Sequence, residues 1–234
     1  MLSGSRPTFD VETEMISKPR VKISCIQSRA EAKMAIEAGA HALGLVPVVP
    51  DGPGTITEGQ IAHIVAHVPP AISTFLLTCR NDVKEIAYQA RISKVDTIQL
   101  CTRLSLGDYA CLRREIPSVS LVQAVKIQDR NAMDAVHEVA SFVDAVQLEL
   151  DSDRGEDLSE MDGLVRSQLL ATCAEIKHKI STPVFLSGGL TAENVVEAVL
   201  KVQPYGIDVC NGVRTENRLD DDKLKRFMAS LGAL

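Results

Sequence analysis

The chain contains 234 residues, of which 45% are hydrophobic, 24% are charged and only 3% are aromatic. This length suits a single α/β domain, and it is sufficient to bury a substantial core of Val, Ile, Leu and Ala. The net charge of −6 disfavours general binding to nucleic acid or to anionic membranes, because both surfaces repel an acidic protein.

Targeting segments and cysteine spacing narrow the choice further. The first twenty residues are charged and lack the apolar region of a secretory signal, and the chain has no apolar run of about 18 residues that would span a membrane. The six cysteines show no C-x-x-C spacing, which favours reduced thiols in a cytoplasmic protein over a disulfide framework or a zinc site. We therefore expect no metal, membrane or nucleic-acid partner, and either a monomer or a homodimer.

Residues 1–19 lack periodicity, and we expect a flexible extension there, before a single domain at 20–234. Within that domain, short apolar runs alternate with stretches of helical periodicity. The runs predict eight strands, at 21–26, 42–46, 72–77, 97–100, 120–124, 145–150, 184–186 and 207–209. The periodic stretches predict eight helices, at 30–38, 58–67, 83–91, 106–115, 132–139, 164–179, 192–202 and 223–231.

Strict alternation of strands and helices indicates a parallel sheet with right-handed crossovers. Eight such units in one domain favour an α/β fold of the closed (β/α)₈ barrel type, a TIM barrel. The alternative is an open doubly wound sheet, which commonly carries G-x-G-x-x-G after its first strand. Residues 24–27 read Ser-Cys-Ile-Gln at that point, so we favour the barrel.

Two glycine turns follow the last two predicted strands. Gly188 and Gly189 come after the seventh strand, and Asn211, Gly212 and Val213 come after the eighth. Glycines let the backbone pass close to an oxyanion, and Thr191 is a suitable N-cap for a following helix whose positive end attracts it. Barrels often bind phosphate with these two loops. The pattern predicts a phosphorylated small-molecule ligand, although a Gly-Gly pair can also serve only as a tight turn.

Several segments of the chain fall in the order and at the spacing of one known family. They are 21–23, 37–44, 68–70, 98–100, 186–190 with 193–195, and 207–209 with 212–213. Together they resemble the phosphoribosylanthranilate isomerase family of tryptophan biosynthesis over about residues 21 to 231. The resemblance implies a (β/α)₈ enzyme without metal or organic cofactor, which converts an aminoaldose into an aminoketose by an Amadori rearrangement. Such a reaction needs a general acid to open the ribose ring and a general base to move a proton from C2.

The catalytic positions depart from the family pattern. The family begins with Lys-Ile-Cys-Gly and uses the Cys as base, whereas here Ser24 falls on that position and Cys25 on the glycine. Adjacent residues of a strand point to opposite faces, so Cys25 replaces the base only if the strand bulges. The resemblance aligns Glu149 with the family's acid, and Asp151 lies two residues further on the same face. Gly54 stands where the family has the Arg that grips the anthranilate carboxylate.

Two functions remain open on these residues. The first is a divergent phosphoribosylanthranilate isomerase with Ser24 or Cys25 as base and Glu149 or Asp151 as acid. The second is a family paralogue that keeps a phosphorylated ligand but has lost this activity, since a fold does not fix a function.

Overall fold

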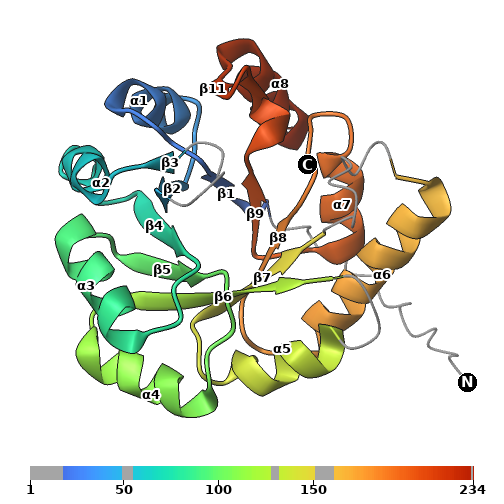
Figure 1. The fold of residues 1–234 in the computed structure, drawn as a ribbon. Coiled ribbons are helices and arrows are strands. Elements are labelled where there is room, and N and C mark those ends of the chain that lie inside the picture. Colours follow the sequence, from blue (N-terminus) through green and yellow to red (C-terminus); the bar gives the residue numbers. More distant parts are fainter. Residues whose placement is uncertain (1–17, 49–54, 128–131, 151–160, 233) are drawn as a thin grey trace, which may run out of the picture.

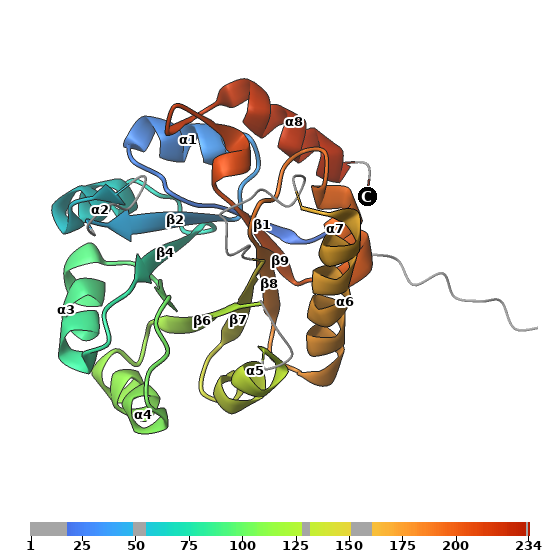
Figure 2. The same cartoon turned by 45° about the vertical axis from the view of Figure 1, so that its right-hand side comes forward.

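A computed structural model describes residues 18–48, 55–127, 132–150, 161–232 and 234. Parallel strands form a closed barrel in which β1 pairs with both β2 and β9, and helices surround it (Figures 1 and 2). The predicted barrel is therefore confirmed. Its strands are β1 (Arg20–Ile23), β2 (Ala42–Pro47), β4 (Ser73–Thr78), β5 (Thr97–Leu100), β6 (Ser120–Lys126), β7 (Ala145–Glu149), β8 (Val184–Ser187) and β9 (Gly206–Val209).

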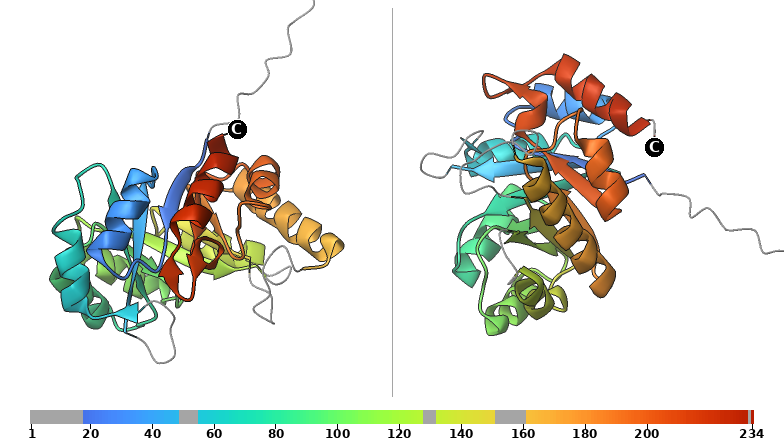
Figure 3. Two further views of the ribbon diagram at one scale, coloured as in Figure 1. Left: turned by 90° about the horizontal axis from the view of Figure 1, so that it is seen from above. Right: turned by 90° about the vertical axis from the view of Figure 1, so that its right-hand side faces the viewer.

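The helices lie on the outside of the barrel, with α6 and α7 side by side (Figure 3). They are α1 (Arg29–Glu37), α2 (Glu58–Val65), α3 (Val83–Ser93), α4 (Leu106–Glu115), α5 (Ala132–Ala140), α6 (Gly163–Lys179), α7 (Val195–Val202) and α8 (Asp221–Gly232). Four short elements complete the described part, namely β3 (Thr55–Ile56), the 3₁₀ helix η1 (Asn211–Val213), β10 (Arg214–Thr215) and β11 (Arg218–Leu219). Of the expected extension, residues 1–17 lie outside the described residues.

Local sequence explains where most helices begin. Polar side chains at the N-caps accept hydrogen bonds from backbone N–H groups of the first turn, which have no partner within the helix. Thr57 and Gln60 form a reciprocal capping box at α2, and Asp82 accepts from two N–H groups at α3. The same kind of cap starts α1, α4 and α6 at Ser28, Ser105 and Asp162. These capping residues mark where five of the helices begin.

Two predicted boundaries are wrong by three residues, more than any other boundary of the barrel strands and helices. The first strand ends at Ile23 rather than at residue 26, because Cys25 has a left-handed backbone with φ of 62°. Helix α7 begins at Val195 rather than at residue 192. Thr191 caps a turn before it instead, where its hydroxyl accepts a hydrogen bond from the Glu193 N–H at 3.3 Å. Both differences lie at the C-terminal ends of barrel strands, where the backbone turns to form loops.

The barrel interior has an apolar part and a polar part. The apolar part is a cluster of Ala42, Phe75, Val122, Ala145 and Phe185, with the two phenyl rings edge to face at 6.0 Å. A separate and larger cluster fills the space between the strands and the helices. Every second side chain of a strand points into the barrel, so the interior residue two positions after an apolar one lies in the next layer along the barrel axis.

The polar part centres on a buried ion pair between β1 and β9. Lys22 Nζ lies 2.9 Å from Asp208 Oδ2, and the lysine side chain is 0% exposed. The same ammonium donates hydrogen bonds to the amide oxygens of Gln99 and Gln147, and it lies 4.7 Å from the centre of the Phe75 ring. A buried ion pair is costly to desolvate and is tolerated when further hydrogen bonds satisfy its remaining groups. Lys22 and Asp208 therefore depend on each other.

We predict that Lys22→Met lowers the free energy of unfolding by about 3 kcal/mol, because the buried Asp208 carboxylate loses its counter-charge. Asp208→Asn should be similarly destabilising, and the double variant should lose less than the sum of the two. Urea unfolding followed by circular dichroism measures all three. Lys33→Met is the matched control, since Lys33 pairs with Glu37 at the exposed surface at 3.6 Å. Additive losses from the two buried substitutions would contradict the coupling.

Candidate active site

A cavity of about 320 Å³ lies at the C-terminal ends of the barrel strands. It is lined by Ser24, Cys25, Glu149, Gly188, Gly189, Asn211 and Gly212, which are seven of the nine site residues expected from the sequence. Val213 does not line it, and Asp151 lies outside the described residues. The cavity joins the expected phosphate turns to the expected catalytic positions, so one ligand can contact both.

The turn after β8 needs glycine for steric reasons. Gly188 has φ of 100° and Gly189 has φ of 55°. A Cβ atom on Gly188 would lie 2.0 Å from the carbonyl oxygen of Leu150, which is far inside van der Waals contact. The side chain of Asn194 holds the turn, because its Oδ1 accepts from the Thr191 N–H at 2.9 Å and its Nδ2 donates to the Gly189 carbonyl at 2.8 Å. This turn presents main chain to the cavity.

The turn after β9 is built on the 3₁₀ helix η1. Gly212 packs against the first turn, since a Cβ atom there would lie 1.9 Å from the carbonyl oxygen of Leu190. The two glycine turns therefore contact each other. The Val213 side chain is completely buried, and its N–H donates to the Cys210 carbonyl at 3.3 Å. Val213 thus supports the turn from beneath, whereas Asn211 and Gly212 face the cavity.

Ser24 follows the last residue of β1, on the same face as Lys22. Its hydroxyl donates a hydrogen bond of 2.5 Å to Asp208 Oδ1, and the residue is only 3% exposed. The other oxygen of Asp208 binds the Lys22 ammonium and the amide of Gln147, at 2.9 and 3.1 Å. Both oxygens of the Asp208 carboxylate therefore accept hydrogen bonds. Ser24 keeps its proton in this arrangement and positions the end of β1.

Cys25 lies in the cavity beside Ser24, and this corrects the expectation that adjacent strand residues would face opposite ways. Its left-handed backbone turns the side chain inward. The Arg214 guanidinium donates hydrogen bonds to the carbonyl oxygens of Cys25 and Ser24, and it pairs with Glu31 at 3.0 Å. This buried arginine therefore holds the turn in which Cys25 departs from the strand.

The thiol of Cys25 has a lowered pKa. A hydrogen bond from the side chain of Cys210 is the main cause, and the positive charge of Arg214 adds to it. Burial and the negative charge of Asp208 act in the opposite direction. The thiolate is the nucleophilic and basic form of cysteine, so a lowered pKa makes Cys25 a stronger candidate for a base than the neighbouring serine.

Glu149 has the opposite shift at the end of β7. Burial raises the pKa of its carboxyl, and the negative charge of Asp208 raises it further. The positive charges of Lys22 and Lys126 oppose this effect, as does a hydrogen bond of 3.4 Å from the Gln147 amide. A carboxyl with a raised pKa keeps its proton to a higher pH and can donate it. Glu149 therefore has the properties of an acid.

Comparison with known proteins identifies the family of this chain. Residues 21–230 match the family model of N-(5'-phosphoribosyl)anthranilate (PRA) isomerase. The N-(5'-phosphoribosyl)anthranilate isomerase of Nostoc punctiforme is 31% identical over 220 residues, covering 92% of this chain and 99% of that protein. Isomerase 2 of Methanosarcina mazei is 31% identical over 204 residues, covering 87% and 89%. The chain belongs to the phosphoribosylanthranilate isomerase family.

Solved structures of the isomerase family share the fold. The isomerase of Thermotoga maritima superposes with a TM-score of 0.78 at 23% identity, covering 92% of this chain and 100% of that one. A family structure in complex with reduced 1-(o-carboxyphenylamino)-1-deoxyribulose 5-phosphate has a TM-score of 0.77 at 21% identity, with the same coverage. Monomers generated from the dimeric T. maritima isomerase have a TM-score of 0.75.

Several cavity residues were not assigned as site residues from the sequence alone. They share a polar side chain at the C-terminal half of a barrel strand or directly after one, and they are Gln99, Lys126, Gln147, Ser187, Asp208 and Cys210. A signal was present in Val-Lys-Ile at 21–23 and Ile-Asp-Val at 207–209, where a charge interrupts a buried strand. Opposite charges in two buried strands indicate a pair, because an unpaired buried charge is rarely tolerated.

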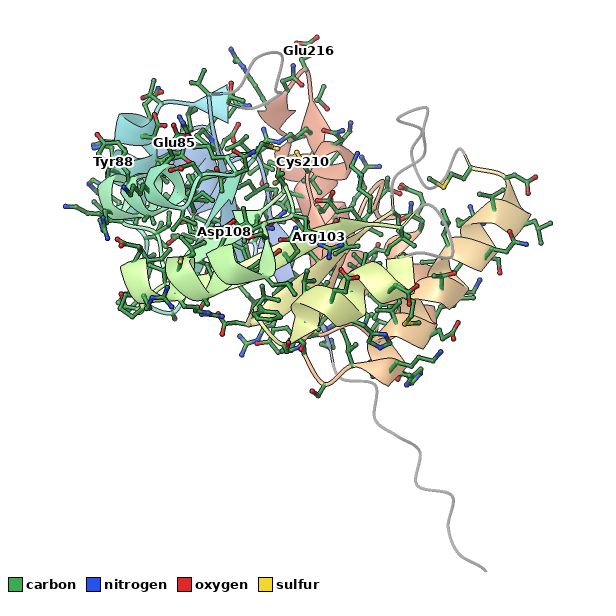
Figure 4. All side chains as sticks on the ribbon, turned by 60° about the horizontal axis from the view of Figure 1, so that its bottom comes forward. Glu85, Tyr88, Arg103, Asp108, Cys210 and Glu216 are labelled. Carbon is green, nitrogen blue, oxygen red and sulfur yellow. The ribbon has the colours of Figure 1, made fainter. Side chains whose placement is uncertain are left out.

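Other charged groups near the strand ends pair on the surface. Arg80 forms an ion pair with Glu85 at 2.7 Å, and Arg103, labelled in Figure 4, pairs with Glu138. Neither arginine lines the cavity, and neither does any of the five histidines. Among the described residues, no group of three or more His, Cys, Asp or Glu could hold a metal ion. None of the described helices is long and apolar enough to cross a membrane.

We predict that Cys210→Ala raises the pKa of Cys25, since it removes the largest cause of the lowered value. Alkylation of Cys25 by iodoacetamide at neutral pH should become severalfold slower, because less of the thiol is ionised. The rate is followed by mass spectrometry of the tryptic peptide at 23–29. Cys173 is the internal control, since burial raises its pKa to about 12 in α6. An unchanged rate at Cys25 would contradict the assigned cause.

Proposed function

We propose that this protein catalyses the isomerisation of N-(5'-phosphoribosyl)anthranilate, in which an aminoaldose becomes an aminoketose. The observation that most supports this proposal is that one cavity contains a thiol with a lowered pKa, a carboxyl with a raised pKa and two glycine turns. Membership of the isomerase family supports the same reaction, and it does not favour the alternative of a paralogue without this activity. Either a monomer or a homodimer is compatible with this proposal.

In the proposed reaction, the phosphate of the substrate binds the turns at Gly188-Gly189 and Asn211-Gly212. Main-chain N–H groups bind an oxyanion there without a charged side chain. The sugar then extends over the buried polar side chains that line the cavity, which we call its polar floor, namely Ser24, Gln99, Gln147 and Asp208. Gln99 supports this placement, because its side chain is 1% exposed and its Nε2 has no hydrogen-bond partner in the described part of the chain. A sugar hydroxyl would satisfy that buried donor.

The proton steps are assigned to two side chains. Glu149 in its protonated form donates to the ring oxygen, which opens the ribose and leaves an iminium group. The Cys25 thiolate then removes the C2 proton and gives the enolamine that becomes the ketose. We assign the base to Cys25 rather than Ser24, because the Ser24 proton is already donated to an occupied carboxylate. Asp151, which follows Glu149 by two residues, is the second candidate for the acid.

We predict that Cys25→Ser and Glu149→Gln each lower kcat by about a hundredfold or more, the usual loss when a general base or acid is removed. Ser24→Ala and Asp151→Asn are the matched controls and should have much smaller effects. Fluorescence assay of the purified variants with N-(5'-phosphoribosyl)anthranilate gives kcat, and growth of a tryptophan auxotroph lacking the isomerase gives an independent readout. If Cys25→Ser kept its rate and Ser24→Ala lost it, Ser24 would be the base. No turnover by the native protein would refute the proposed function.

The phosphate turn has a separate test. Inorganic phosphate and ribose 5-phosphate should raise the melting temperature of the native protein, because a ligand that binds only the folded state stabilises it. Gly188→Ala should abolish this rise, since the added methyl group collides with the Leu150 carbonyl. Gly163→Ala is the matched control, as nothing lies within 4 Å of a Cβ atom there. An equal rise in both variants would contradict the phosphate site.

A further inference from the structure

Two cysteines, Cys25 and Cys210, lie together in the cavity, although the proposed isomerase reaction uses only Cys25. Cys25 follows β1 and Cys210 follows β9, two adjacent parallel strands whose residues Ile23 and Val209 are paired. The pairing extends one residue further, since the Ser24 N–H donates to the Val209 carbonyl at 2.9 Å. Both thiols are free, both line the cavity, and their side chains form a hydrogen bond with each other. Cys210 is labelled in Figure 4.

This geometry suits a disulfide. A disulfide bridges Cα atoms about 4.4 to 6.8 Å apart. Neighbouring strands of a sheet lie about 4.8 Å apart, and Cys25 is offset from Cys210 by one residue in the register of β1 and β9, a rise of about 3.3 Å along the strand. The hydrogen bond between the two thiols brings their sulfur atoms together at this end of the paired strands. Cys25 stands where the family pattern has glycine. The pair is therefore a feature of this chain.

The two thiols also have complementary roles in exchange chemistry. Cys210 donates its proton toward Cys25, which lowers the pKa of Cys25 and raises that of Cys210. Cys25 is thus the attacking thiol, and Cys210 is placed to resolve a mixed disulfide. A second pair, Cys79 and Cys101, lies after β4 and β5, but burial and the neighbouring Cys79 raise the pKa of Cys101 to about 12. This second pair is a natural comparison within the same barrel end.

We propose that Cys25 and Cys210 form a reversible disulfide site that reacts with low-molecular-weight disulfides of the glutathione type. The Cys25 thiolate attacks the S–S bond of the reagent, forms a mixed disulfide and releases one small thiolate. Cys210 then loses its proton, and its sulfur attacks the Cys25 sulfur and expels the second small thiolate. Two protein thiols are oxidised to one disulfide, and one reagent disulfide is reduced to two thiols.

Formation of this bond would switch off the proposed reaction. The disulfide consumes the Cys25 thiolate, and it restrains Cys210, the residue directly before the proposed phosphate turn at Asn211-Gly212. This consequence rests on the proposed function, in which Cys25 is the base, whereas formation of the bond does not. The two statements can therefore fail separately.

The experiment incubates the full chain with hydroxyethyl disulfide, which is small enough to enter the cavity, and maps the products by mass spectrometry. Trypsin places all six cysteines in different peptides, with Cys25 in 23–29 and Cys210 in 202–214. We expect a cross-link between these two peptides that dithiothreitol reverses. Cys210→Ser should stop at a mixed disulfide on Cys25. Cys79→Ser combined with Cys101→Ser should still form the cross-link.

Activity is measured on the same samples. A fall in turnover by about a hundredfold on cross-linking, restored by dithiothreitol, supports both the site and its consequence. A cross-link in a protein that is inactive in both states supports the disulfide site and refutes the proposed function. If the native chain gives no cross-link between the two peptides, and its products match those of Cys210→Ser, the disulfide site is refuted whatever the activity.

Discussion

The ion pair between Lys22 and Asp208 is the interaction on which the rest of the site depends. It joins β1 to β9, the two strands at which the barrel closes, and it is buried in the interior. Such a pair is tolerated when its remaining hydrogen-bonding groups have partners. Gln99 and Gln147 provide these partners from two further strands. The polar floor is thereby tied to four strands of the barrel, and a shift in any of them would break the ion pair or one of its buried hydrogen bonds.

This floor sets the positions of the reactive groups above it. Ser24 donates to the second oxygen of Asp208, which fixes the end of β1, and the chain turns at the next residue. The turn is held from the other side by Arg214, whose own charge is balanced by Glu31. Cys25 is therefore placed by two independent charged groups, one inside the barrel and one outside it. A left-handed residue other than glycine is strained by about 1 kcal/mol or more, and these contacts compensate for it.

The fold could be predicted from the sequence because the patterns that indicate strands and helices are local. Buried parallel strands appear as short apolar runs, helices carry a period of 3.6, and caps such as Thr57 and Asp82 mark their starts. The two glycine turns were predictable for a similar reason, since glycines directly after a strand indicate a turn in which the backbone can approach a ligand closely. The orientation of Cys25 was not accessible, because it depends on Arg214, which lies 189 residues away in the chain. The Lys22 and Asp208 pair was missed although each charge stands within an apolar strand.

The two halves of the cavity also differ in how they tolerate change of sequence. An oxyanion bound by main-chain N–H groups depends on backbone conformation, which here requires Gly188, Gly212 and the side chain of Asn194 that holds the turn. Proton transfer instead depends on individual side chains and on the charges around them. Here the environment that raises the pKa of Glu149 also contains the donor that lowers the pKa of Cys25, so the two values move toward each other. Convergence increases the fraction of molecules in which the carboxyl is protonated while the thiol is ionised, the state that the proposed reaction requires. In the proposed reaction, a cysteine displaced by one residue from the family position therefore serves as base, and the turn after β1 and the neighbouring Cys210 are the features that support this role.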